Sequence, residues 1–225
     1  MGPVRAAEII KEGLYRGADD GYLLTDRAFA GSDTLATSYA LSCAAKKIGD
    51  FNIIIAGSQA IDGDTAQVGP QVAEKLHIPQ VTYIEEIMDI TENDVVVKRR
   101  IENGYEVVKS PLPCLLTVHS SASPCRFRNA KLVMKYKHAR SEMERKADPS
   151  KYDFLSTEHD FLNIKTWTVD DVSADVSQLG LSGSPTKVKS IENVVFKVKE
   201  STRLTDDDGD IESVVKELIA NHTIG

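Results

Sequence analysis

Two segments of the chain combine glycines with short polar side chains of the kind that hold a nucleotide. The first, GSQAIDGDTAQVG, covers residues 57–69, and the second, DRAFAGSDTLAT, covers residues 26–37. Glycine lets a backbone approach a ligand closely, and free N–H groups at the start of a helix attract a phosphate. Hydroxyl and amide side chains can hydrogen-bond a ribose or a base. The chemistry that these residue types favour is therefore nucleotide binding.

In the first segment, Gln59, Thr65 and Gln67 supply the polar side chains. The segment follows an apolar run and precedes a helical pattern, so it falls at the carboxyl end of a strand, where open α/β sheets bind ligands. A structural alternative stays open. Asp64 with Gln67 three residues later resembles a capping box, and Gly63 could simply serve the turn.

The second segment repeats this design after the preceding strand. Ser32 or Asp33 can cap the helix that follows, and Thr34 and Thr37 lie about one turn apart on one face. Their hydroxyls could reach the same ligand, although hydroxyls in a first helical turn often serve only as caps or face solvent. Two such loops on neighbouring strand ends predict a shared crevice.

Alternating strands and helices position these segments. The pattern predicts a helix between Pro3 and Gly17, followed by strand 22–26, helix 33–48, strand 51–57 and helix 65–76. This alternation predicts an α/β fold with a parallel sheet and helices on its faces. After Pro79 three β-rich runs follow, with a hairpin signal at Asn103-Gly104, so we expect an antiparallel edge.

The domain organisation follows from a change of pattern. Residues 1–140 form the expected nucleotide-binding α/β domain, and residues 141–225 form an extended C-terminal arm that ends in the helix IESVVKELI. Such an arm cannot bury much surface against itself, so we expect it to lie on a partner. The strand that normally opens a doubly wound sheet is absent from the pattern.

Composition excludes several functional classes. The net charge is −7 with both signs mixed along the chain, which argues against nucleic-acid binding. No stretch reaches the length of a membrane span and no secretory signal is visible, so we expect a cytoplasmic protein. The three scattered cysteines read as free thiols, no metal site is expected, and no catalytic dyad or nucleophile pair appears.

The sequence resembles the beta subunit of electron transfer flavoproteins. The likeness lies in GSQAIDGDTAQVGPQVAEKLHIPQVTY, LPCLLTV and GLSGSPTKV, and it runs through nearly the whole chain. The resemblance implies an adenine nucleotide alpha hydrolase-like, Rossmann-type domain. It also implies an alpha subunit that carries FAD, and a beta subunit that is an electron carrier with redox activity only in that complex.

Members of this family hold either AMP or a second FAD in the beta subunit. The segment GADDGYLLTDRAFAGSDTLATSYAL is more similar to electron-bifurcating members of anaerobic bacteria. In those members the beta-subunit FAD takes a hydride from NADH. One electron then goes to ferredoxin or flavodoxin and the other, through the alpha-subunit FAD, to an acyl-CoA dehydrogenase-type partner.

The resemblance also assigns cofactor-binding residues. Asp33, Thr34 and Thr37 are candidates on the flavin side. The adenosine diphosphate end is assigned to Gln59, Ala60, Asp62, Gly63, Asp64, Thr65, Ala66, Gln67, Val68 and Gly69.

The segment SPCRFRNAKLVMKYK resembles the family's recognition loop, which docks the redox partner. Its candidate docking residues are Arg126, Phe127, Ala130 and Leu132. The family commonly has a tyrosine where this chain has Phe127, and some members have an anchoring leucine where it has Ala130. The alternative is an amphipathic surface helix with Leu132 and Met134 in the core and its lysines in solvent.

Three readings stay open. The start MGPVRAAEII resembles an internal segment of full-length members, so we expect the first two strands of the family fold to be absent. A plain electron carrier with structural AMP is one alternative to bifurcation. An adenine-nucleotide-binding module of the universal-stress type is another, and it would form a homodimer without an alpha subunit.

Overall fold

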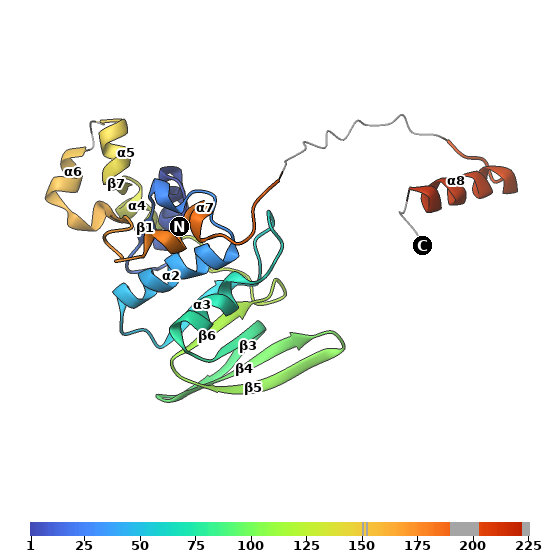
Figure 1. Cartoon of the computed structure of the whole chain (residues 1–225), viewed down its shortest axis with the longest axis horizontal. Coiled ribbons are helices and arrows are strands. Elements are labelled where there is room, and N and C mark those ends of the chain that lie inside the picture. The colour runs from blue at the N-terminus through green and yellow to red at the C-terminus, as the bar shows by residue number, and fades with distance from the viewer. Residues whose placement is uncertain (150, 152, 190–202, 222–225) are drawn as a thin grey trace. The chain divides into compact units, whose positions relative to one another are not determined.

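The structure is a computed structural model that describes residues 1–149, 151, 153–189 and 203–221 (Figure 1). The chain divides into two units, Met1–Lys187 and Val188–Gly225, which are described separately. The expected fold class is confirmed, because parallel strands alternate with helices and an antiparallel hairpin extends one sheet.

Helices and strands alternate as far as residue 90, and three more strands then follow in succession. In chain order the elements are η1 (Val4–Ala6), α1 (Ala7–Tyr15), β1 (Tyr22–Leu24), η2 (Arg27–Phe29), α2 (Thr34–Ile48), β2 (Ile53–Gly57), α3 (Val68–Leu76), β3 (Gln80–Ile90), β4 (Asp94–Ile101), β5 (Gly104–Pro111), β6 (Cys114–Val118), α4 (Ala130–Tyr136), β7 (Arg140–Ser141), α5 (Glu142–Ala147), α6 (Asp153–Glu158), η3 (Asp160–Leu162), β8 (Asn163–Trp167), η4 (Val176–Gln178), α7 (Gly180–Gly183) and α8 (Asp208–Ala220).

A small parallel sheet has the strand order β1-β8-β7. Successive residues of a strand point to opposite faces. Leu23 of β1 accordingly packs with Leu14 of α1 and Tyr136 of α4, while Leu24 packs with Phe29 and with Ala40 of α2. Helices therefore cover both faces of this sheet.

The larger sheet has the order β2-β6-β3-β4-β5. β2 and β3 both run parallel to β6, and β3, β4 and β5 are antiparallel. One face packs against α3 through Leu115 and Val72. On the other face Val95, Val97 and Leu116 are fully buried in a cluster drawn from the strands and the turn before β6. The pairing of β3 with β4 contains register shifts, which mark β-bulges. Bulges bend a strand, so the sheet curves around the side chains buried on this face.

Helix α2 joins the two sheets. Its Ala40 belongs to the core of the small sheet, and its Leu41 packs into the cluster of α3 and β6. The expected helix signals are confirmed at both ends, since Asp33 is the N-cap and Gly49 ends the helix with φ 64°. α2 thereby fixes the two candidate loops relative to each other.

Two details differ from the sequence analysis. β1 pairs with β8 and not with the sheet that holds β2, so the sheet expected as continuous is two sheets. In addition, the sequence pattern predicts a domain boundary at residue 140, whereas the structure divides the chain after Lys187. The reason is that β8, Val169, Val172 and Leu179 complete the core around the small sheet.

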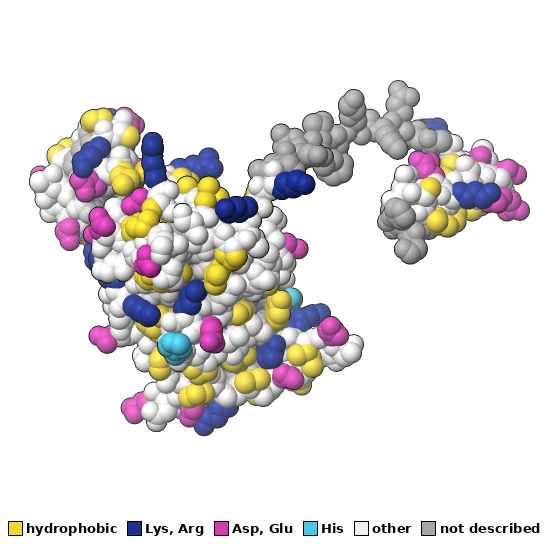
Figure 2. Space-filling view, viewed as in Figure 1, with side chains coloured by type: hydrophobic (Ala, Val, Ile, Leu, Met, Phe, Trp, Pro, Cys, Tyr) yellow, Lys and Arg dark blue, Asp and Glu magenta, His cyan; other side chains and the backbone are white. Residues whose placement is uncertain are grey.

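The second unit contains α8, which carries an apolar stripe. Ile211, Val215 and Ile219 recur four residues apart and are each about half exposed, at 50%, 41% and 53%. Hydrophobic side chains are visible along this helix in Figure 2. Part of the expected arm, residues 190–202, lies outside the described residues. None of the helices in the described part of the chain is long and apolar enough to cross a membrane.

Candidate functional site

The loop over residues 58–67 lies at the carboxyl ends of two neighbouring parallel strands. It follows β2 directly, and the N–H of Ser58 donates to the carbonyl of Val118, the last residue of β6, at 3.0 Å. Ligands of open α/β sheets bind at this edge. The position is therefore the one expected from the sequence.

The loop backbone has two non-glycine residues in the left-handed region. Asp64 has φ 51° and Ala66 has φ 53°, and Gln67 after them is right-handed. Residues other than glycine rarely adopt a positive φ, and backbone strain of this kind concentrates at binding sites. Successive left- and right-handed residues turn their N–H groups into a concavity that attracts anions. The loop thus has a backbone suited to a phosphate.

The start of α3 also favours the binding of an anion at this loop. The helix begins at Val68 and not near Thr65, and its N-cap, Gln67, makes no side-chain capping bond. The alternative capping box is wrong, because the carboxylate of Asp64 instead accepts a hydrogen bond from the amide of Gln59. The first N–H groups of α3 therefore remain available to an anion.

The glycines of the loop divide into two kinds. A Cβ built on Gly57 or Gly63 would meet nothing within 4 Å, which fits the close approach of a ligand. A Cβ on Gly69 would lie 2.7 Å from Cγ2 of Thr117, so Gly69 is needed for α3 to pack on β6. Gly57 and Gly63 therefore leave room for a nucleotide, whereas Gly69 serves the tight packing of α3.

The second loop is tied to a distant segment through Asp33. One carboxylate oxygen caps α2 by accepting from Leu35 N at 3.0 Å and Ala36 N at 3.1 Å. The other accepts from the N–H and hydroxyl of Thr186, at 3.1 and 2.7 Å. Partial burial acts to raise the pKa of Asp33, but these hydrogen bonds outweigh it and the pKa is lowered. Both carboxylate oxygens of Asp33 are thus engaged, one in capping α2 and the other in binding Thr186.

Ser184 and Thr186 were not identified from the sequence. Ser184 accepts a hydrogen bond from Asp33 N at 2.8 Å and donates to the carbonyl of Gly180 at 2.6 Å. Both residues lie about 150 positions after Asp33, at a separation of 151 and 153 residues. Since no local pattern marks such a contact, only the structure could find it.

One hydrogen bond joins the two loops. The hydroxyl of Thr34, in the first turn of α2, donates to the side-chain oxygen of Gln67 at 3.0 Å. Thr37 lies one turn further along α2 and is partly buried. The structure therefore brings residues of both loops to one place.

The expected docking segment is divided between surface and core. Phe127 is 92% exposed, and Arg126 and Ala130 are also exposed. Leu132 is partly buried and packs against the core around α1. The alternative that places Met134 in the core is wrong, since this side chain is 63% exposed.

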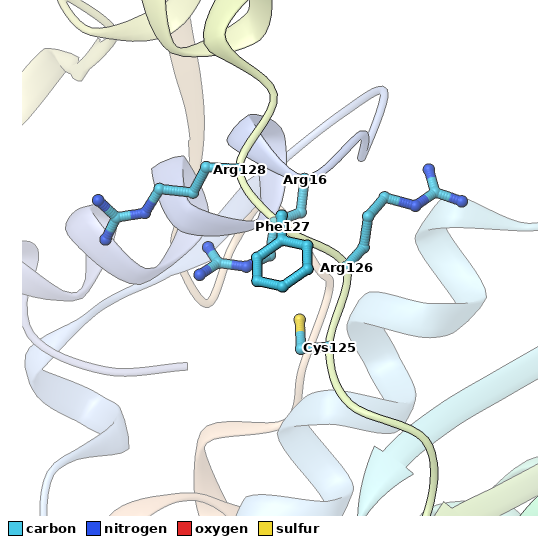
Figure 3. Close-up of a pocket in the computed structure, with 5 residues that line it drawn as sticks. All are labelled: Arg16, Cys125, Arg126, Phe127 and Arg128. Carbon is cyan, nitrogen blue, oxygen red and sulfur yellow. The ribbon is translucent and has the colours of Figure 1, made fainter.

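A surface hollow of about 530 Å³ lies at this segment. It is lined by Arg16, Cys125, Arg126, Phe127 and Arg128 (Figure 3). Arg16 and Arg128 were missed in the sequence. The spacing of Glu12 and Arg16, four residues apart on a predicted helix, is a local signal for Arg16. No local signal marks Arg128, which meets Glu12 at a separation of 116 residues.

Comparison with known proteins gives consistent results. The family description "Electron transfer flavoprotein domain" matches residues 1–150. The electron transfer flavoprotein subunit beta of Thermoanaerobacterium thermosaccharolyticum is 43% identical over 84% of this chain and 63% of its own length. That of Megasphaera elsdenii is 38% identical over 100% of this chain and 77% of its own length. The caffeyl-CoA reductase-Etf complex subunit CarD of Acetobacterium woodii is 39% identical over 84% of this chain and 63% of its own length. The chain thus spans less than two thirds of the length of two of these relatives.

Proposed function

Because the chain belongs to the electron transfer flavoprotein family, as a beta subunit, we propose that it holds an FAD across its two polar loops and works in a heterodimer with an alpha subunit. In that heterodimer, electrons taken from NADH are divided between ferredoxin or flavodoxin and an acyl-CoA dehydrogenase-type partner. The reaction is electron bifurcation.

The hydrogen bond between Thr34 and Gln67 carries this proposal. AMP requires only one phosphate-binding loop, whereas FAD needs a longer site with room for its second half. A contact that fixes the two loops to each other supports a site of that length, and we propose that the adenosine diphosphate end lies at residues 59–69 and the flavin side at Asp33, Thr34 and Thr37. Both helix starts then face the same ligand.

The residues of the chain have binding and positioning roles in this proposal. The strained turn at Asp64 and Ala66 and the first N–H groups of α3 hold the phosphates. Gly57 and Gly63 leave space for the ligand. Asp33 acts through α2, since its carboxylate is already engaged by Leu35, Ala36 and Thr186. The flavin supplies the redox chemistry, and the protein orients it.

The partners follow from the family and from one relative. Beta subunits of electron transfer flavoproteins pair with an alpha subunit, and we propose that α8 and the residues around it contact that subunit. The name of CarD associates it with a caffeyl-CoA reductase. This supports an acyl-CoA dehydrogenase-type protein as the redox partner of this chain. Arg126, Phe127 and Ala130 form the proposed docking surface, and Leu132 anchors it from within.

The test is an electron-transfer assay with the co-expressed heterodimer. NADH, ferredoxin and an acyl-CoA dehydrogenase with its enoyl-CoA substrate are combined, and ferredoxin reduction is followed with each component omitted in turn. Bifurcation predicts that ferredoxin is reduced by NADH only when the acyl-CoA acceptor is present. Reduction of the dehydrogenase without any reduction of ferredoxin would contradict it and support the plain carrier with AMP.

A further inference from the structure

The segment 180–186 lies against the loop before α2 at a distance that only glycine allows. Gly180 has φ 54°, and a Cβ built on it would lie 2.4 Å from the carbonyl oxygen of Ala28. Gly31 has φ 74°, and a Cβ built there would lie 2.7 Å from Cδ2 of Leu181. Figure 1 shows α7, the short helix of this segment, beside α2. The close approach therefore requires a glycine on both sides.

Hydrogen bonds join the segment to the loop at three successive points. The hydroxyl oxygen of Ser32 accepts from the N–H of Gly180 at 3.1 Å. The buried hydroxyl of Ser184 accepts from the N–H of Asp33 at 2.8 Å and donates to the carbonyl of Gly180 at 2.6 Å. The N–H and hydroxyl of Thr186 donate to Oδ2 of Asp33 at 3.1 and 2.7 Å. The segment thus binds both the main chain and the side chain of Asp33.

These bonds fix the orientation of the residue that caps α2. Because Thr186 binds Oδ2 of Asp33, the other oxygen, Oδ1, is directed to the first N–H groups of the helix. Hydrogen bonds to an ionised carboxylate are stronger than those between neutral groups, so the cap is held firmly. Thr34 is the next residue, and its hydroxyl donates to Gln67 in the other loop at 3.0 Å. A segment about 150 residues away in the chain therefore positions the contact between the two loops.

We propose that Ser184 and Thr186 are positioning residues of the cofactor site, which hold the first turn of α2 through Asp33 and thereby favour FAD over AMP. The inference rests on the FAD site proposed above. In that site AMP uses only the loop after β2, whereas FAD also uses the flavin side at the start of α2. A displaced α2 therefore weakens the binding of FAD and leaves the binding of AMP unchanged.

The test is the displacement of FAD from the co-expressed heterodimer by added AMP. Only the FAD that AMP releases is counted, so the FAD of the alpha subunit does not enter the measurement. We expect Thr186→Val to lower the AMP concentration for half release by about threefold to tenfold, the range typical for the loss of one hydrogen bond. Ser184→Ala removes the acceptor of the Asp33 N–H and should shift the release in the same direction.

Two further variants separate positioning from a general loss of stability. Thr186→Ser keeps the hydroxyl and should restore the wild-type value. Thr168→Val is the matched control, since the N–H and hydroxyl of Thr168 both donate to one oxygen of Asp171, each at 2.8 Å, and this carboxylate does not cap α2. The displacement compares two nucleotides on one protein, so a change that weakens both equally leaves it unaltered.

The possible results separate this inference from the proposed function. Earlier release from Thr186→Val and Ser184→Ala, with Thr186→Ser and Thr168→Val like the wild type, supports the inference. Release at the wild-type AMP concentration from Thr186→Val and Ser184→Ala overturns the inference and leaves the proposed FAD site standing. Earlier release from Thr168→Val as well also overturns it, because the effect would then not pass through Asp33. A wild-type heterodimer whose beta subunit holds no FAD contradicts both.

Discussion

The hydroxyl of Thr34 lies 3.0 Å from the side-chain oxygen of Gln67, although the two residues belong to different strand–loop–helix units. Each unit alone is an ordinary turn of an α/β protein. Joined by this bond, the start of α2 and the end of the loop before α3 form one polar edge. The proposed FAD site depends on this relationship.

Removing the bond between the two loops should weaken FAD binding. We expect Thr34→Ala and Gln67→Ala each to lower the FAD retained by the heterodimer, and the double variant to lose less than the sum, because the residues act as a pair. FAD content after gel filtration measures the effect. Thr91→Ala, in the turn after β3, removes a hydroxyl of the same kind away from the loops and should change nothing. Additive losses would contradict the pairing.

The glycines should separate ligand binding from folding. Gly57→Ala and Gly63→Ala add a methyl group to open space, so the melting temperature should hold while nucleotide affinity falls. Gly69→Ala brings a methyl group 2.7 Å from Thr117 Cγ2 and should destabilise the fold by about 1–3 kcal/mol. Thermal unfolding and nucleotide titration measure the two effects. A wild-type affinity in Gly63→Ala would place the ligand elsewhere.

The stability contributed by Asp33 should depend on pH in the acid range. Its hydrogen bonds lower its pKa in the folded state. A carboxylate with a lowered folded pKa stabilises the fold above its unfolded pKa of about 3.9, and this contribution is lost as the pH falls through the folded value.

Asp33→Asn is the variant that tests this dependence. The difference in melting temperature between the wild type and Asp33→Asn should be constant near neutral pH and should shrink below about pH 4. Ser177→Ala removes a hydroxyl of η4 that is bound to Asp175, and it serves as a control without contact to Asp33. A difference that persists unchanged in acid would show that the charge of Asp33 is not what stabilises the segment around Thr186.

The apolar stripe of α8 should be required for assembly with the alpha subunit. We expect Ile211→Asp with Val215→Asp to reduce heterodimer yield strongly, while the melting temperature of the first unit is unchanged because α8 belongs to a separate unit. Glu212→Gln with Lys216→Gln removes the exposed ion pair on the polar side of the helix and serves as the control. Equal yields of all variants would mean that the stripe has another role.

Local signals predicted the elements well. The cap at Asp33 and the stop at Gly49 were sufficient for α2, and Asn103-Gly104 was sufficient for the hairpin of β4 and β5. The start of α3 was misplaced because Asp64 bonds to Gln59 and not to the helix. The pairing of β1 with β8 was not predictable, since register over such a separation depends on packing and not on a local pattern.

The positions of the two candidate loops could be predicted from the sequence, and their contacts only in part. Polar residues after two strands indicated the two loops, but not that Thr34 and Gln67 touch or that Asp33 is engaged by Thr186. The resemblance makes Phe127 a candidate docking residue, and that role stays a prediction. The contact of the neighbouring Arg128 with Glu12 depends on α1 and the segment before α4 meeting in space.

The measurement that tests the central claim most directly is the identity and amount of the nucleotides released from the denatured heterodimer. An FAD held across both loops of this chain, together with the FAD of the alpha subunit, predicts two FAD and no AMP per heterodimer. One FAD with one AMP would contradict the claim, because the loop after β2 would then bind a structural nucleotide and the contact between Thr34 and Gln67 would serve the fold alone.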